Sequence, residues 1–92
     1  MYKVSIGELV QVDWDDANAD YGWQDPKQVK VQAYPVASFG IVVAYNEECI
    51  CLTESVTYKD KSRTTPKLDG IGSTLNIPWV NVVNVFKTGW HV

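Results

Sequence analysis

Apolar and polar residues alternate along much of this chain with the period of a β-strand. Because successive side chains of a strand point to opposite faces, this alternation predicts strands with one buried face. Four short alternating runs, a corner at residues 77–80 and one last strand are typical of a small five-stranded β-barrel. Spacing typical of helices is nearly absent. The pattern therefore predicts an all-β protein.

The first strand is expected at residues 9–14, where Val10, Val12 and Trp14 share one face. The residues between them are polar, so we expect the apolar set to face the core. The same reasoning predicts that Phe39, in a later apolar run, is also a core residue.

The middle of the chain is expected to form a meander. A short strand at residues 29–34 is followed by Pro35, which has no N–H for a ladder and so limits this strand to an edge or a strand end. The most apolar run, residues 39–45, is predicted to be the central strand of the sheet.

A hairpin is predicted directly after that central strand. Residues 46–48 supply a turn of Asn and Glu, and the chain returns along residues 49–54. Alternation in the returning strand places Ile50 and Leu52 toward the interior.

Two long loops and a short helical corner complete the expected fold. Residues 15–28 form a first long loop rich in turn residues, and residues 57–73 form a second loop or a flexible hairpin. A strand at residues 74–77 leads into one helical turn at residues 78–81, and residues 82–86 form the closing strand.

Length and composition are those of one small globular domain. The chain has 92 residues, 46% of them hydrophobic and 21% charged, so we expect residues 1–92 to fold as a single domain. The first residues lack the apolar centre of a signal peptide, and no run is long enough to span a bilayer. We therefore expect a cytoplasmic protein with no membrane partner.

The two cysteines, Cys49 and Cys51, stand two positions apart. On a strand this spacing separates their Cα atoms by about 6.5 Å, at the outer edge of disulfide reach and with side chains that do not converge. We expect reduced thiols packed in or beside the barrel. The single histidine, His91, leaves a zinc site short of ligands, so no metal is predicted.

No group of residues in the sequence predicts catalysis. A nucleophile needs a base within hydrogen-bond reach, and His91 is the penultimate residue. Asp13 and Asp15 share a strand face but lie in a polar stretch that offers no apolar wall to raise a pKa. There is also no glycine-rich phosphate loop. We predict that the protein is not an enzyme and uses no cofactor.

The net charge of −3 is distributed unevenly along the chain. Residues 1–26 contain six acids against Lys3, whereas residues 59–67 contain four basic residues against Asp60. One interpretation is that both stretches are solvated loops. The other is that they meet opposite charges, on a neighbouring copy of the chain or on an anionic ligand.

The chain has more large aromatics than a small barrel can hide, with four Trp and five Tyr. Such residues anchor protein interfaces, so some are expected to be exposed for binding. Tyr21 and Trp23 lie in the first long loop, and loops of this length without secondary structure are often functional. Trp79 and Trp90 lie in the corner and the tail, where packing over a barrel end competes with partner binding.

Nucleic acid is a second candidate ligand, although the overall charge opposes it. A nucleic-acid binder depends on cationic contacts to phosphates, and this chain has 8 basic against 11 acidic residues. Locally, Tyr58 has the chemistry to stack a base while Lys61 or Arg63 holds a phosphate. A small nucleotide needs fewer basic groups, so a nucleotide-sequestering pocket remains an alternative.

The order of strands, loops and corner resembles the SH3-like and Sm-like small barrels, in which a one-turn helix separates the last two strands. More narrowly, residues 7–17, 38–43, 75–78 and 82–85 are similar to short uncharacterised proteins of bacteriophages. The chain departs from that pattern at Trp79, where those proteins more often have a basic residue. The resemblance implies a phage protein in the host cytoplasm, either a minor virion component or a binder of a host factor.

Together these observations predict a non-enzymatic module for protein interaction or self-assembly. We expect a closed homo-oligomer in which the acidic loop of one copy lies near the basic loop of the next. The stretch at residues 81–87 is expected to pair with a neighbour as an exposed edge. The candidate binding residues are Tyr21, Trp23, Tyr58, Lys61, Arg63, Trp79 and Trp90.

Overall fold

The computed structural model describes residues 2–17, 22–29 and 31–92 of the chain. Its strands are β1 (Glu8–Asp16), β2 (Tyr34–Tyr45), β3 (Cys49–Thr53), β4 (Val56–Tyr58), β5 (Pro66–Ile71), β6 (Thr74–Pro78) and β7 (Val82–His91). The helical elements are single 3₁₀ turns, η1 (Pro26–Gln28) and η2 (Trp79–Asn81). No helix in the described residues is long and apolar enough to cross a membrane. The predicted all-β class is confirmed.

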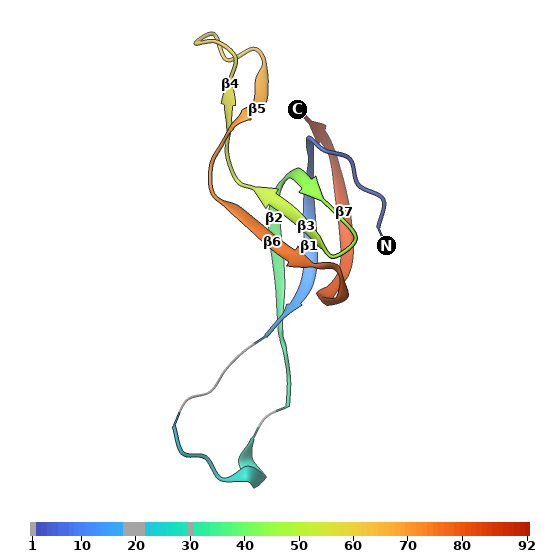
Figure 1. The fold of residues 1–92 in the computed structure, drawn as a ribbon, viewed down its shortest axis with the longest axis vertical. Coiled ribbons are helices and arrows are strands. Elements are labelled where there is room, and N and C mark those ends of the chain that lie inside the picture. Colours follow the sequence, from blue (N-terminus) through green and yellow to red (C-terminus); the bar gives the residue numbers. More distant parts are fainter. Residues whose placement is uncertain (1, 18–21, 30) are drawn as a thin grey trace.

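Five strands form one antiparallel sheet in the order β6-β3-β2-β1-β7. The sheet is bent, so that β3 and β6 cross in front of β1 and β2 in the view of Figure 1. The prediction of a closed barrel is wrong: within the described residues the sheet is open, with β6 and β7 as its edges. The reason is that η2 carries the chain from one edge strand to the other without a hydrogen-bonded ladder between them.

The inner face of the bent sheet carries an aliphatic core. Val10, Val12, Val42, Ile50 and Ile77 have no exposed surface. Val4 and Leu52 complete this cluster, and Trp14, Trp79, Val82 and Val85 pack against it. Alternation therefore predicted the buried face of β1 and β3 correctly, and Trp14 lies half-buried at its margin.

Strand β2 begins later than predicted and runs through the proline. Residues 31–33 have no strand structure, and Pro35 lies inside β2, paired with Asp15 of β1. At that point the described strands pair only β1 with β2, so the missing N–H of Pro35 disrupts no second described ladder. The separate strand expected at residues 29–34 is wrong, because Val29 and Val31 are exposed and have no core to cover.

Phe39 is exposed, which corrects the prediction that it is a core residue. Its side chain is 66% exposed, and the inner position opposite Val10 belongs to the next residue, Gly40. A Cβ atom on Gly40 would lie 2.9 Å from both Leu52 Cβ and the carbonyl oxygen of Thr53. Glycine therefore allows β3 to approach β2 closely, and this sets the face on which Phe39 lies.

The predicted turn between β2 and β3 is confirmed. The side chain of Asn46 accepts hydrogen bonds from the backbone N–H groups of Glu48 and Cys49, each at 2.8 Å. Both Cys49 and Cys51 are free thiols and are half-buried, as expected.

The predicted helical corner is confirmed as η2, and Trp79 fixes it to the sheet. The indole Nε1 of Trp79 donates to the carbonyl oxygen of Asn46 at 2.8 Å, and its ring stacks on Tyr2 with centroids 6.5 Å apart. The hydroxyl of Tyr2 donates in turn to the carbonyl oxygen of Val83 in β7. The N-terminal segment therefore runs beside the outer edge of β7 (Figure 1).

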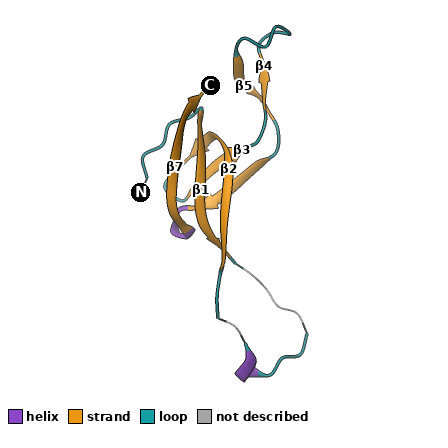
Figure 2. Ribbon diagram, turned by 180° about the vertical axis from the view of Figure 1, so that it is seen from behind, coloured by secondary structure: helices purple, strands orange, loops and turns teal. Residues whose placement is uncertain are grey.

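For the second long loop, at residues 57–73, the sequence left open a loop or a hairpin, and the structure shows a hairpin. Strands β4 and β5 pair as a separate two-stranded sheet that projects beyond one end of the main sheet (Figure 2). Gly70 allows this pairing to be close, because a Cβ atom there would clash with the side chain of Thr57.

Candidate interaction surface

The outer face of the sheet carries two exposed phenylalanines on either side of a glutamine. Gln11 of β1 pairs with Phe39 of β2 and with Phe86 of β7, so the three side chains form a row across three strands. Phe39 is 66% and Phe86 is 46% exposed, while Gln11 is half-buried between them. We call Phe39, Gln11 and Phe86 the outer row. Exposed aromatic surface of this kind marks interaction sites in soluble proteins.

Next to the outer row lies a hollow with an acidic rim. Its volume is about 360 Å³, within the range of ligand clefts. The hollow is lined by Asp13, Trp14, Asp15, Pro35, Val36, Ala37 and Val83. We call it the acidic hollow.

The carboxylates of the acidic hollow extend the outer face along β1. Asp13 pairs with Ala37 and Asp15 pairs with Pro35, in the same alternation as Gln11 with Phe39. The side chain of Gln11 donates to Asp13 at 2.8 Å, which links the outer row to the hollow. No basic side chain among the described residues forms an ion pair with either aspartate.

The β4–β5 hairpin brings three of the predicted site residues together. Tyr58, Lys61 and Arg63 line one hollow of about 740 Å³ on this hairpin, together with Val56, Thr57, Lys59 and Asp60. The guanidinium carbon of Arg63 lies 5.8 Å from the centroid of the Tyr58 ring, a cation–π arrangement. We call residues 56–71 the basic hairpin.

The tip of the basic hairpin is organised around Asp60. Its carboxylate accepts hydrogen bonds from the hydroxyls of Ser62 and Thr64, and the Ser62 bond is the main cause that lowers the pKa of Asp60. The backbone N–H of Arg63 donates to the carbonyl oxygen of Asp60 at 3.2 Å. Arg63 has a φ of 61°, a left-handed conformation that residues other than glycine seldom adopt. This turn therefore sets the direction of the Arg63 side chain.

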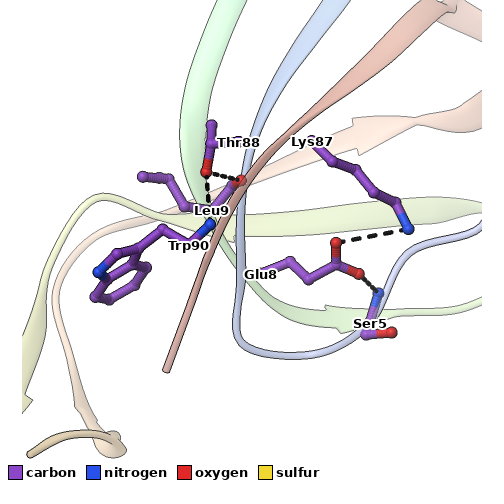
Figure 3. A network of polar contacts seen from close by, with 6 residues as sticks. All are labelled: Ser5, Glu8, Leu9, Lys87, Thr88 and Trp90. Carbon is purple, nitrogen blue, oxygen red and sulfur yellow. Dashed lines mark hydrogen bonds and ion pairs between the residues drawn. The ribbon is translucent and has the colours of Figure 1, made fainter.

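Trp90 lies elsewhere, near the end of β7, and is 45% exposed. Its backbone N–H donates to the hydroxyl of Thr88, and that hydroxyl donates to the carbonyl oxygen of Leu9 at 2.9 Å. Figure 3 shows the indole of Trp90 pointing away from the neighbouring ion pair of Glu8 and Lys87, whose charged atoms are 3.6 Å apart. These contacts join β7 to β1 where the register of their pairing shifts.

The other predicted site residues do not join a common site. Trp23 is fully exposed. It belongs to residues 22–29, a described segment that lies at the opposite end of the molecule from the basic hairpin (Figure 1). Trp79 is half-buried and held at the corner by Tyr2 and Asn46. Tyr21 lies outside the described residues.

The outer row and the acidic hollow were not predicted from the sequence as a binding surface. Phe39 was assigned to the core, and Phe86 was not considered as a site residue. The available signal was the spacing of Gln11, Asp13 and Asp15, which places polar groups on one face of β1. The pairing register that brings two phenylalanines beside Gln11 depends on tertiary structure.

The described residues bring together few groups capable of chemistry. The Nδ1 atom of His91 lies 3.2 Å from the backbone oxygen of Val92, at the end of the chain. In the described ranges, no group of three or more His, Cys, Asp or Glu side chains is placed to hold a metal ion.

Comparisons with known proteins gave no match for this chain: no family model, no curated protein and no solved structure is similar enough to assign a relative.

Proposed function

We propose that this protein is a non-enzymatic interaction module that associates with copies of itself through the outer face of its five-stranded sheet. The observation that carries the proposal is the outer row, in which Phe39 and Phe86 remain exposed on either side of Gln11. The inner face already has an aliphatic core to which neither ring contributes, so the two rings are available for a partner. Their burial against a partner removes apolar surface from water, which favours association.

Edge strands provide additional support for an interaction role. In the described structure β6 pairs only with β3, so one of its sides has no strand neighbour. Leu75 on this strand is 41% exposed. An unpaired edge is a template for strand addition by another chain. The edge of β7 is different, because Tyr2 of the N-terminal segment binds the carbonyl oxygen of Val83 there.

The resemblance to short bacteriophage proteins extends this proposal to a cellular setting. We place the module in the cytoplasm of an infected host cell, where its own copies, a virion component or a host protein is the partner. A virion component co-purifies with phage particles, whereas a host-factor binder remains in the soluble lysate.

Sedimentation velocity over a concentration series tests the proposal. We expect the wild-type protein to increase in average mass with concentration, and a Phe39→Ser/Phe86→Ser variant to stay monomeric. The matched control is Val80→Ser, which removes an apolar side chain that is 92% exposed at the corner. A wild-type protein that stays monomeric over the series would contradict the proposal, as would a Phe39→Ser/Phe86→Ser variant that associates like wild type.

A second candidate function is binding of a small nucleotide or of RNA by the basic hairpin. The observation that favours it is that Tyr58, Lys61 and Arg63 line the same hollow. Titration with ATP and with oligouridylate tests this candidate, using a Lys61→Ala/Arg63→Ala variant for comparison. A bound nucleotide at a hundredfold excess over its dissociation constant raises stability by about 2.7 kcal/mol, and RNA binding weakens steeply with salt. Equal behaviour of wild type and variant rejects the candidate.

A further inference from the structure

Two surfaces of opposite charge lie at opposite ends of the five-stranded sheet. The basic hairpin projects beyond one end of the sheet (Figures 1 and 2). The acidic hollow is lined by residues from the end of β1 and the start of β2. These strand ends lie at the other end of the sheet (Figure 1). The molecule is elongated, with principal extents of 59, 27 and 20 Å. The two surfaces of one chain are therefore directed away from each other.

Among the described residues, most of the charges on these surfaces form no ion pair. The described ion pairs join Lys67 to Asp69 and Lys87 to Glu8. Lys61 and Arg63 on the hairpin, like the aspartates of the acidic hollow, are outside these pairs. Because opposite charges attract over about one Debye length, roughly 8 to 10 Å in ordinary buffers, such surfaces steer two copies into a head-to-tail encounter.

The two surfaces also match in chemistry at short range. The hairpin presents an aromatic ring, Tyr58, with the guanidinium of Arg63 beside it. The acidic hollow presents the apolar surfaces of Pro35 and Val83 beside the carboxylate of Asp15. A planar guanidinium binds a carboxylate through two parallel hydrogen bonds, and an aromatic ring packs well on proline and valine.

We infer that the basic hairpin of one copy docks into the acidic hollow of a second copy, beside its outer row. This inference rests on the proposed self-association and assigns the surfaces that meet. The contact is heterologous, because each copy offers its hairpin to one neighbour and its hollow to another. If the rotation between neighbouring copies closes on itself, the assembly is a ring of fixed mass. If it does not close, the assembly is an open filament that grows with concentration.

Charge reversal tests the docking. One variant, Asp13→Lys/Asp15→Lys, makes the hollow basic, and a second variant, Lys61→Glu/Arg63→Glu, makes the hairpin acidic. Each variant alone is expected to self-associate at least tenfold more weakly than wild type in sedimentation velocity at low salt. An equimolar mixture is expected to regain association, because each reversed surface then meets its complement on the other variant.

Matched controls change the net charge by the same amount at other positions on the surface. Glu47→Lys is compared with Asp15→Lys as a single substitution, and Lys3→Glu is compared with Arg63→Glu. All four of these positions are exposed, so these single variants also cover the case in which a double variant fails to fold. The controls are expected to associate as wild type does.

The outcomes separate this inference from the proposed function. If wild type associates and the reversed variants associate as tightly as the controls, the docking is wrong and self-association through the outer row stands. If Phe39→Ser/Phe86→Ser associates like wild type while the reversed variants do not, the outer row is wrong and the docking stands. The docking is overturned if the wild-type protein remains monomeric at low salt. It is also overturned if Lys61→Glu/Arg63→Glu loses oligouridylate binding but still associates as wild type does.

Discussion

The two faces of the five-stranded sheet differ in residue type and in burial. The inner face is built from valine, isoleucine and leucine that are buried, whereas the outer face displays two exposed phenylalanines beside polar and acidic side chains. Burial of an aliphatic side chain stabilises a fold by about 1.5 to 3 kcal/mol, so the inner face supplies most of the stability. If the proposed function is correct, stability and association depend on opposite sides of the same strands. Substitutions on the two sides should therefore separate these properties.

The largest expected effect is on the inner face. Ile50 is completely buried and pairs with Ile77, which is also completely buried. Ile50→Ala is expected to lower the free energy of unfolding by about 2 to 5 kcal/mol, through lost apolar contact and a residual cavity. Urea denaturation measures the change, with Val80→Ala at the exposed corner as the control. Equal loss in both variants would contradict a core centred on Ile50.

A smaller effect is expected where β3 approaches β2. Gly40→Ala places a Cβ atom 2.9 Å from Leu52 Cβ and from the backbone oxygen of Thr53. Because one of these neighbours is backbone, the strands must shift, at a cost of about 1 to 3 kcal/mol. Thermal denaturation followed by circular dichroism detects this loss. A variant as stable as wild type would contradict the close approach of β3 to β2 at Gly40.

The next effect concerns the one buried polar side chain of the described core. The hydroxyl of Thr53 lies near the carbonyl oxygens of Ser55 and Ser73, at 3.1 and 2.9 Å, and Thr53 is 1% exposed. Thr53→Val is expected to lower the free energy of unfolding by about 0.5 to 1.5 kcal/mol, because it removes part-buried hydrogen bonds of the Thr53 hydroxyl.

Thr74 provides the matched control for this substitution. It pairs with Thr53 across β3 and β6 but is exposed, so Thr74→Val is expected to change stability by less than about 0.5 kcal/mol. Denaturant titration of both variants makes the comparison. A larger loss for Thr74→Val than for Thr53→Val is incompatible with the burial described above.

The smallest effect on stability is expected on the outer face. Phe39→Ser removes a ring that is mostly in solvent, so the free energy of unfolding of the monomer should change by less than about 1 kcal/mol. Self-association should nevertheless be lost when Phe86→Ser is added. Denaturation at low concentration and sedimentation at high concentration measure the two properties separately. A large loss of monomer stability would assign these rings to the fold instead.

Local sequence patterns predicted the elements whose environment is local. The alternation of Val10 with Val12 identified the buried face of β1, and Asn46 marked the turn whose backbone it caps. The corner at residues 78–81 was also predicted, and Pro78, the last residue of β6, leads directly into η2. These features depend on neighbours in sequence.

Features that depend on distant contacts were not predicted. The face of Phe39 is set by the close approach of β3 to Gly40, and an apolar run alone does not reveal that approach. Barrel closure was expected from strand order, but it also requires a ladder between the edge strands. For the candidate site, sequence reasoning grouped Tyr58, Lys61 and Arg63 because they are close in sequence. The acidic hollow is lined by residues of three strands, and the pairing register of these strands cannot be read from the sequence alone.

A dilution series followed by ¹⁵N NMR of the wild-type protein tests the central claim most directly. The account predicts that amide signals of Gln11, Phe39 and Phe86 shift with concentration while those of Val12 and Ile50 stay constant. Shifts spread equally over both faces, or none at any concentration, would contradict the assignment of association to the outer face.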